Sequence, residues 1–144
     1  MSERGLLPPR AQAAPPAQPV APGRDLRPRV RLRVWLETDD GLFVGLGRAQ
    51  LLANIAQYGS LKQAAEHMGM SYRAAWGKLR QSEKVLGFQL VARRGRRRDG
   101  QVLTPFGRLL MERYLRWFAA VEKDAQDRAR EIFGIPVRAY AQDS

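Results

Sequence analysis

Five arginines fall within six consecutive residues of this chain. They are Arg93, Arg94, Arg96, Arg97 and Arg98. A guanidinium group offers paired N–H donors whose geometry matches the oxygens of a phosphate. Such a run is most often a solvated face, but five like charges on one loop also repel each other unless an anion neutralises them. The loop is therefore a candidate site for a polyanion.

The composition of the whole chain also favours an anionic partner. The chain has 25 Lys and Arg against 14 Asp and Glu, which leaves a formal net charge of +11. A small protein this basic usually binds nucleic acid or an acidic membrane surface. Its 144 residues provide room for one ordinary domain plus tails.

The pattern of two capped helices joined by a tight turn occupies residues 60–86. Ser60 and Gln63 match a capping box, and an apolar stripe at helical spacing follows. Gly69 is expected to end this first helix, because glycine adopts the left-handed conformation without a steric penalty. Ser71 then caps a second, longer helix. Together these features predict a helix-turn-helix, a motif that binds DNA.

In such a motif the first turn of the second helix meets base edges in the major groove. The predicted DNA contacts from the two helices are Lys62, Gln63, Ser71, Tyr72, Arg73, Trp76, Gly77 and Arg80. Arg73 is the candidate for a bidentate contact with guanine. Lys62 and Gln63 are expected at the sugar-phosphate backbone.

Three of these residues have a second interpretation. Tyr72 is suited to a phosphate or a thymine methyl group, and equally to packing against the preceding helix. Trp76 is suited to the core as well as to DNA. Gly77 costs a helix about 1 kcal/mol relative to Ala, which suggests that a backbone approaches closely there. The predicted inner face of the helix consists of Ala74, Ala75 and Leu79.

Several other classes of function are excluded or disfavoured. Cysteine is absent and His67 is the single histidine, so zinc fingers built on thiolates and cysteine nucleophiles are excluded. We expect no metal site and no cofactor. An enzyme is not predicted, because no nucleophile is paired with a base and no Gly-rich phosphate loop occurs. No run of 18 apolar residues and no secretory signal is present, so we predict a cytoplasmic protein without membrane contact.

Hydrophobic periodicity indicates the elements that must position these side chains. The expected elements are strands over 30–37 and 42–44, helices over 48–58, 61–68 and 72–86, a β-hairpin wing with strands at 90–91 and 102–103, and a helix over 105–133. The predicted fold class is mainly α with small β elements: a winged helix-turn-helix with an N-terminal β-hairpin and a long C-terminal dimerisation helix. The arginine loop lies in the wing, directly after the helix-turn-helix, which favours contact with phosphates or the minor groove.

The last helix is longer than one small domain needs. At 1.5 Å per residue, about 28 residues extend for about 42 Å. Its apolar stripe consists of Leu110, Tyr114, Trp117, Val121 and Ala125. We predict that these residues contact a second subunit in a twofold homodimer, the commonest symmetric assembly.

Three segments divide the chain. Residues 1–28 are rich in Pro, Ala and Arg and are predicted to be a disordered arm. This arm is either a basic extension that touches a neighbouring DNA groove or an inert one. Residues 29–134 form the predicted domain, with the dimerisation helix at 105–133, and residues 135–144 form a C-terminal tail.

Residues 30–133 resemble the N-terminal winged helix-turn-helix domain of molybdate-responsive ModE regulators, and more distantly the DNA-binding domain of LysR-type regulators. The resemblance rests on Gly59-Ser60, Gln63-Ala64, Gly69-Met70-Ser71-Tyr72, Ala75-Trp76, Leu90-Val91-Ala92-Arg93, Val102-Leu103-Thr104 and Gly107. The tryptophan favours the ModE branch, because LysR-type domains usually lack it. The resemblance implies a dimeric bacterial transcription regulator that binds double-stranded DNA.

ModE proteins continue into β-barrel domains that bind molybdate, and we expect those domains to be absent here. A separate oxyanion-sensing partner would then supply any response to molybdate. Two alternatives to a sequence-specific regulator therefore stay open. One is an oxyanion-linked regulator with an anion at the arginine-rich surface, and the other is a non-specific architectural DNA-binding protein.

Overall fold

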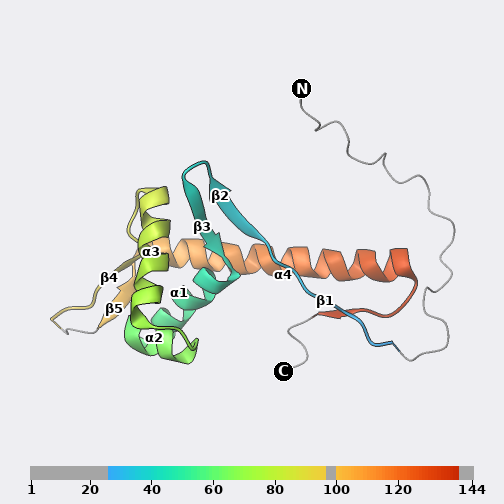
Figure 1. The fold of residues 1–144 in the computed structure, drawn as a ribbon, viewed down its shortest axis with the longest axis horizontal. Helices are drawn as coiled ribbons and strands as arrows, with labels where there is room; N and C mark the ends of the chain where they lie inside the picture. The colour runs from blue at the N-terminus through green and yellow to red at the C-terminus, as the bar shows by residue number, and fades with distance from the viewer. Residues whose placement is uncertain (1–25, 97–99, 140–144) are drawn as a thin grey trace. The chain divides into compact units, whose positions relative to one another are not determined.

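The computed structural model describes residues 26–96 and 100–139 (Figure 1). In chain order its elements are β1 (Arg29–Val30), β2 (Trp35–Thr38), β3 (Gly41–Gly45), α1 (Leu46–Tyr58), α2 (Leu61–His67), α3 (Tyr72–Leu86), β4 (Val91–Arg93), β5 (Gln101–Leu103), α4 (Pro105–Phe133) and β6 (Arg138–Ala139). The fold is mainly α with small β elements, as predicted. The predicted bounds of α3 and α4 are confirmed, and α1 begins two residues before the predicted start. Most of the predicted arm, together with Arg97 and Arg98, lies outside the described residues.

The described residues belong to two compact units. Residues 32–121 form one unit, and residues 26–31 together with 122–139 belong to the other. Helix α4 contributes its first part to the larger unit and its last part to the smaller one.

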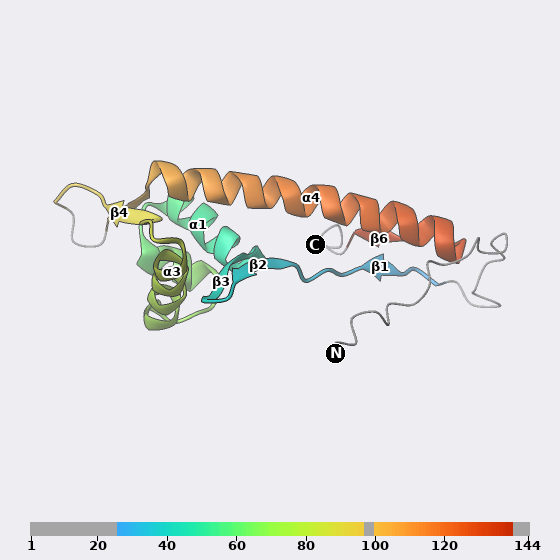
Figure 2. The ribbon, with the colours of Figure 1, turned by 90° about the horizontal axis from the view of Figure 1, so that it is seen from above.

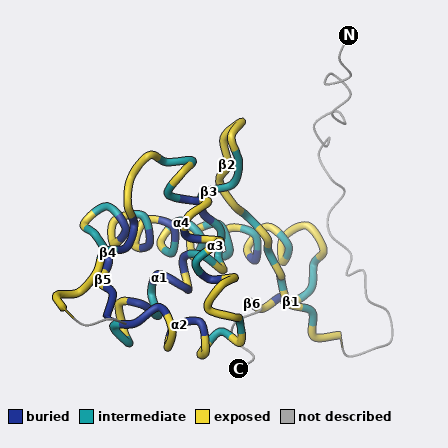
Figure 3. Tube along the Cα trace, turned by 60° about the vertical axis from the view of Figure 1, so that its left-hand side comes forward, coloured by how far each residue is buried: buried dark blue, intermediate teal, exposed yellow. Residues whose placement is uncertain are grey.

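The core of the larger unit lies among α1, α2, α3 and the β4–β5 hairpin. Its largest fully buried side chains include Leu51, Leu52, Ile55, Leu61 and Leu79. Figure 3 shows the buried parts of these helices in dark blue. Small residues let the helices cross closely. The small residues buried in this cluster are Ala64, Ala65 and Ala75. Ala56, an apolar residue of α1, is exposed.

The hairpin β2–β3 confirms the predicted turn but shortens the predicted strand. Strand β2 pairs antiparallel with β3 from Trp35 opposite Gly45 to Thr38 opposite Gly41, with a β-bulge after Leu36. Strand β3 is the one that packs against α1 and α3, so β2 lies outside it. For this reason the apolar side chain of Leu36 is 42% exposed.

Arg48 of α1 joins the hairpin to α3. Its Nη1 donates to the carbonyl oxygen of Leu42 at 2.9 Å and to Oγ of the fully buried Ser82 at 3.0 Å. Its Nη2 donates to Oε1 of Gln81 at 2.6 Å. Burial lowers the pKa of this guanidinium. Helix α1 lies between α3 and the first part of α4 (Figure 2). From this position the side chain of Arg48 reaches α3, the helix that is predicted to bind DNA.

The wing is attached to α3 and α4 through backbone groups. Oε2 of Glu83 accepts the N–H of Leu90 at 2.8 Å, which fixes the chain where it enters β4. Thr104 caps α4 by accepting the N–H of Gly107 at 2.9 Å, and its hydroxyl donates to the carbonyl of Gln89 at 2.6 Å. Gly107 itself lies against the carbonyl of Leu90, where a Cβ would overlap the oxygen. Helix α4 therefore approaches the wing as closely as a glycine allows.

The first part of α4 also holds the extended segment before β2. Tyr114 is 3% exposed and packs near Val44 and Ala49. Its hydroxyl donates to the carbonyl oxygen of Val34 at 2.6 Å, and its ring lies edge-on to Trp117 with centroids 5.7 Å apart. Burial raises the pKa of Tyr114 above its usual value near 10. Tyr114, predicted to contact a second subunit, thus serves the core of its own chain.

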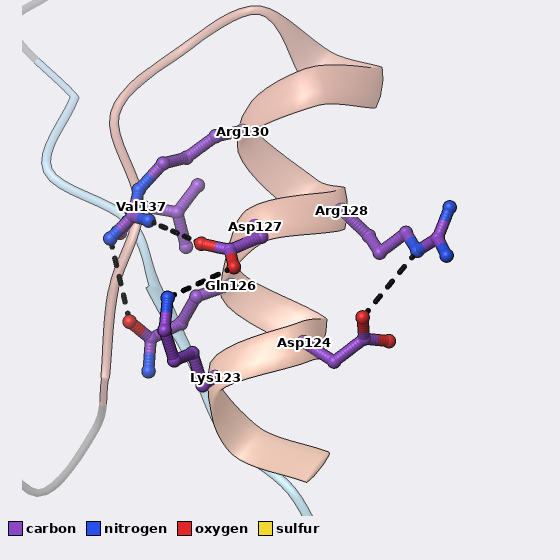
Figure 4. Close-up of polar contacts among 7 residues, drawn as sticks. All are labelled: Lys123, Asp124, Gln126, Asp127, Arg128, Arg130 and Val137. Carbon is purple, nitrogen blue, oxygen red and sulfur yellow. Dashed lines mark hydrogen bonds and ion pairs between the residues drawn. The ribbon is translucent and has the colours of Figure 1, made fainter. Parts of the chain in front are cut away.

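The smaller unit is held by a parallel pairing that the sequence did not predict. Strand β1 pairs with β6 through Arg29 opposite Arg138 and Val30 opposite Ala139. Part of the predicted C-terminal tail is therefore a strand. Near it, Nε of Arg130 donates to the carbonyl of Val137 at 3.0 Å, and Asp127 accepts both Arg130 and Lys123 (Figure 4). No helix in the described ranges combines the length and apolar character needed to cross a bilayer.

We predict that Gly107→Ala lowers the free energy of unfolding by about 1–3 kcal/mol, because the new methyl group must displace the Leu90 carbonyl. Urea denaturation measures the effect. Gly77→Ala is the matched control, since nothing lies within 4 Å of a Cβ at position 77 and the helix gains up to about 1 kcal/mol. Equal effects of the two substitutions would contradict the proposed close contact.

We predict that Tyr114→Phe costs about 0.5–1.5 kcal/mol near neutral pH, because the Val34 carbonyl loses its donor. Above pH 10 the unfolded wild-type chain releases the phenolic proton of Tyr114 before the folded chain does, so wild-type stability falls as the pH rises. The stability difference between wild type and variant should therefore shrink between pH 9 and pH 11, roughly the range around the usual tyrosine pKa. Denaturation across this range measures the difference, and a constant difference would argue against a buried phenol.

Candidate nucleic-acid interface

The N-terminus of α2 is satisfied by two side chains. Oγ of Ser60 accepts the N–H of Gln63 at 3.1 Å, which confirms the predicted cap. Oε1 of Gln101, in the wing, accepts the N–H of Leu61 at 2.7 Å. Lys62 and Gln63 remain exposed on the outer side of the helix. Both predicted phosphate-contacting side chains are thus available to a ligand.

The turn between α2 and α3 is the tight one that the sequence predicts. Gly69 has a φ of +65°, and the N–H of Met70 donates to the carbonyl of Ala65 at 3.0 Å. Met70 and Met68 pack against the core from outside. Ser71 accepts the N–H of Ala74 at 3.0 Å and caps α3. The turn and the two caps fix how α3 is presented.

The inner and outer faces of α3 differ in one place from the prediction. Ala75, Leu79 and Ser82 are buried, as the helical period requires. Ala74, which was predicted on this inner face, is exposed. Ala75 lies on the side of α3 that also contains Leu79 and Ser82, and Ala74, about 100° away around the helix, lies outside that side.

Arg73, Gly77 and Arg80 are exposed on the outer side of α3. Nothing lies within 4 Å of the position that a Cβ of Gly77 would take. This glycine therefore serves no packing contact in the described part of the chain, although it costs the helix about 1 kcal/mol. Its position suits a ligand that approaches the helix backbone.

An aromatic row borders this outer side. Tyr72 is 47% exposed and lies edge-on to Trp76, with ring centroids 6.3 Å apart. The guanidinium carbon of Arg80 lies 5.4 Å from the centre of the Trp76 ring, within range of a cation–π interaction. Trp76 is half-buried against the core. Trp76 therefore packs against the core, which is one of the two roles that the sequence left open, and its ring also contacts Arg80.

The wing lies next to the helix-turn-helix (Figure 1). Strands β4 and β5 pair antiparallel, and the side chains of Arg93, Arg94 and Arg96 are exposed. Nη1 of Arg94 lies 2.9 Å from the position of a Cβ on Gly59, the residue that ends α1. At least one wing arginine thus lies beside the start of α2.

The charge of this region is strongly positive. Residues 59–96 contain eight Lys and Arg against two Glu. One of the two, Glu83, turns its carboxylate to the backbone N–H groups of Leu90 and Val91. Among residues 59–96, this leaves Glu66 as the acidic side chain that is not bound to the backbone of the wing. Within the described ranges no three His, Asp or Glu side chains form a group that would hold a metal ion.

Gln101 is a residue of this interface that sequence reasoning missed. It is 6% exposed; its N–H donates to the carbonyl of Gly59 at 3.0 Å, and its side chain caps Leu61. A signal was present, because Leu103 two residues later points inward and a strand alternates its faces. The amide side chain of Gln101 gave no indication that it binds Leu61, which lies 40 residues earlier in the chain.

The predicted dimerisation residues lie at different depths along α4. Tyr114 is buried, whereas Leu110, Trp117, Val121 and Ala125 are half-buried within the single chain. Leu110 and Trp117 contribute to the core through contacts with their own chain. The large apolar side chains of α4 that stay exposed are Leu109, Ile132 and Phe133.

Known proteins resemble this region in sequence and in fold. Residues 46–108 match the family model of bacterial regulatory helix-turn-helix proteins of the lysR family. The molybdenum-pterin-binding protein MopB of Rhodobacter capsulatus is 32% identical over 114 residues, which cover 72% of this chain and 42% of MopB. The DNA-binding transcriptional dual regulator ModE of Escherichia coli K12 is 32% identical over 88 residues, 60% of this chain and 34% of ModE.

A solved structure shows the same fold. The BenM DNA-binding domain in complex with benA site 1 DNA matches with a TM-score of 0.50 and 18% identity, over 60% of this chain and 94% of that domain. The chain spans less than half the length of either MopB or ModE. The similarity therefore covers the helix-turn-helix region and not the whole of these regulators.

We predict that Gln101→Leu destabilises the fold by about 1–3 kcal/mol, because the buried N–H of Leu61 loses its acceptor. Chemical denaturation measures the change. Gln57→Leu, at an exposed position of α1, is the matched control and should change stability by less than about 0.5 kcal/mol. A neutral Gln101→Leu would show that the wing does not depend on this bond.

Proposed function

We propose that this chain is a sequence-specific, DNA-binding transcriptional regulator, since residues 46–108 match the family model of bacterial regulatory helix-turn-helix proteins of the lysR family. The observation that carries the proposal is the outer face of α3. It exposes Arg73, Gly77 and Arg80 next to a wing with further exposed arginines. A face of this kind combines base-reading groups with groups that bind phosphates.

In the proposed complex α3 enters the major groove with its first turn against the bases. Arg73 binds guanine through O6 and N7. Ser71 and the hydroxyl of Tyr72 contact phosphates, as do Lys62 and Gln63 at the start of α2. Trp76 orients Arg80, and the lack of a side chain at Gly77 lets the helix backbone approach the DNA.

The wing supplies contacts that do not depend on sequence. The proposed phosphate or minor-groove contacts are Arg93, Arg94 and Arg96, together with Arg97 and Arg98 outside the described residues. Binding to phosphates releases counterions, so this part of the affinity falls steeply with salt. The same contacts offset the mutual repulsion of the arginines.

We further propose a homodimer. Helix α4 exposes apolar side chains that a partner could cover, among them Leu109, Ile132 and Phe133. Tyr114, in contrast, is almost completely buried within its own chain. The outward parts of Leu110, Trp117, Val121 and Ala125 complete the proposed contact. A twofold dimer of this kind reads two half-sites about 10 bp apart.

A molybdate-linked response is a second candidate. It is favoured by the similarity to MopB, a molybdenum-pterin-binding protein, and to ModE. We propose that such a response acts through a separate oxyanion-sensing partner, because an oxyanion site needs converging donors and the described arginines of the wing are exposed on a hairpin. A non-specific architectural role is the remaining alternative.

Selection of binding sites from random DNA duplexes, at two salt concentrations and with and without molybdate, tests the proposal. We expect an enriched palindrome with half-sites about 10 bp apart. Absence of enrichment, with an affinity that collapses as the salt concentration rises, would establish the architectural alternative. Dependence on molybdate in the purified protein would assign sensing to this chain itself.

We predict different defects for the two groups of arginines. Arg73→Ala should relax the preference at one base pair and cost about 1–3 kcal/mol on the selected site. Arg96→Ala and Arg97→Ala should weaken selected and random duplexes alike and reduce the salt slope by about 1 each. Binding titrations on matched selected and random duplexes measure both. A changed base preference in Arg97→Ala with an unchanged salt slope would reverse the assigned roles.

A further inference from the structure

Ala74 is an apolar residue held rigidly on the outer side of α3. It lies in the first turn, and its N–H donates to Oγ of Ser71 at 3.0 Å, so the cap fixes its backbone. Its side chain is a single methyl group without rotamers, and it is exposed. The core of α3 is completed by Ala75 and Leu79 without it. Ala74 therefore contributes no buried contact that would explain an apolar residue here.

The neighbours of Ala74 leave its methyl group accessible. Gly77, one turn later, has no side chain, and nothing lies within 4 Å of its would-be Cβ. Arg73 and Lys78 are exposed on either side of these two small residues. Positions 74 and 77 are adjacent on a helix surface. Together they form a shallow apolar strip between two cations, in the turn that meets base edges in the proposed complex.

The major groove offers one apolar group to such a strip, the C5-methyl group of thymine. We propose that the methyl group of Ala74 contacts the C5-methyl group of a thymine in the base pair next to the guanine bound by Arg73. This inference rests on the proposed function, and it adds a specificity-determining residue to the same face of α3. A small residue is required, because a longer side chain at position 74 would hold the helix away from the groove.

Tyr72 is less suited to this contact. Its ring lies edge-on to Trp76, and Trp76 in turn faces Arg80, so the aromatic row is engaged within the protein. The phenolic hydroxyl at the end of the side chain is a donor and acceptor, which suits a phosphate oxygen better than a methyl group. The methyl contact is therefore assigned to Ala74.

The test uses the full chain and the duplex that it selects from random DNA. Each thymine of a half-site is replaced in turn by deoxyuridine, a change that removes only the C5-methyl group. We expect one position per half-site at which affinity falls about fourfold, the factor for one buried methyl group. In Ala74→Gly, thymine and deoxyuridine at that position should bind equally, while effects at all other positions persist.

Two variants separate the contact from a general effect on the helix. Ala56→Gly introduces the same flexibility at an exposed position of α1 and should keep the full fourfold effect of deoxyuridine. Ala74→Ser keeps the Cβ but adds a hydroxyl, and should reduce the preference for thymine. Circular dichroism confirms that each variant is folded.

The outcomes distinguish this inference from the proposed function. A selected duplex in which no thymine is sensitive to deoxyuridine overturns the methyl contact and leaves the regulator proposal standing. A sensitive thymine that remains equally sensitive in Ala74→Gly assigns the contact to another residue and overturns it as well. A chain that enriches no duplex overturns both proposals.

Discussion

The buried side chain of Gln101 is the constraint on which the arrangement of the interface depends. Gln101 binds both sides of the junction between α1 and α2. Its backbone N–H donates to the carbonyl of Gly59, and its side chain accepts the N–H of Leu61. The N-terminus of α2 would otherwise contain an unsatisfied buried donor, which is costly. The wing is thus attached to the helix-turn-helix by bonds that tolerate little displacement. These bonds therefore also fix the position of β4, which carries the wing arginines, relative to α3.

The other contacts that fix the interface also involve the backbone or buried groups. Glu83 binds backbone N–H groups at the start of the wing, and Gly107 lets α4 touch the Leu90 carbonyl. Arg48 crosses from α1 to the hairpin carbonyl and to Ser82. None of these groups belongs to the outer face of α3. In the proposed complex, stability and base recognition therefore depend mostly on different residues, and we expect changes on the outer face to alter base preference without unfolding the domain.

Local signals were sufficient to predict most of the elements. The bounds of α3 and α4 follow from Ser71, Thr104 and the helical apolar period, because capping and periodicity are properties of adjacent residues. The pairing of β1 with β6 was not predictable in this way, since it joins residues more than 100 positions apart and each strand has only two residues. The contact of Gln101 with Leu61 and those of Arg48 with Gln81 and Ser82 were missed because they also join residues far apart in the chain, 33 to 40 positions.

The candidate site was predictable in composition but not in detail. Residue type and spacing alone predicted the arginines and the glycine at position 77 as contacts, and the structure shows that those it describes are exposed. Ala74 was placed on the wrong face, because Ala74 and Ala75 are chemically identical and only the packing of Leu79 and Ser82 determines which of them is buried. This single correction changes the character of the face. An interface otherwise composed of cations and aromatic rings acquires a small apolar strip at Ala74 and Gly77, where shape and not charge would distinguish one base pair from another.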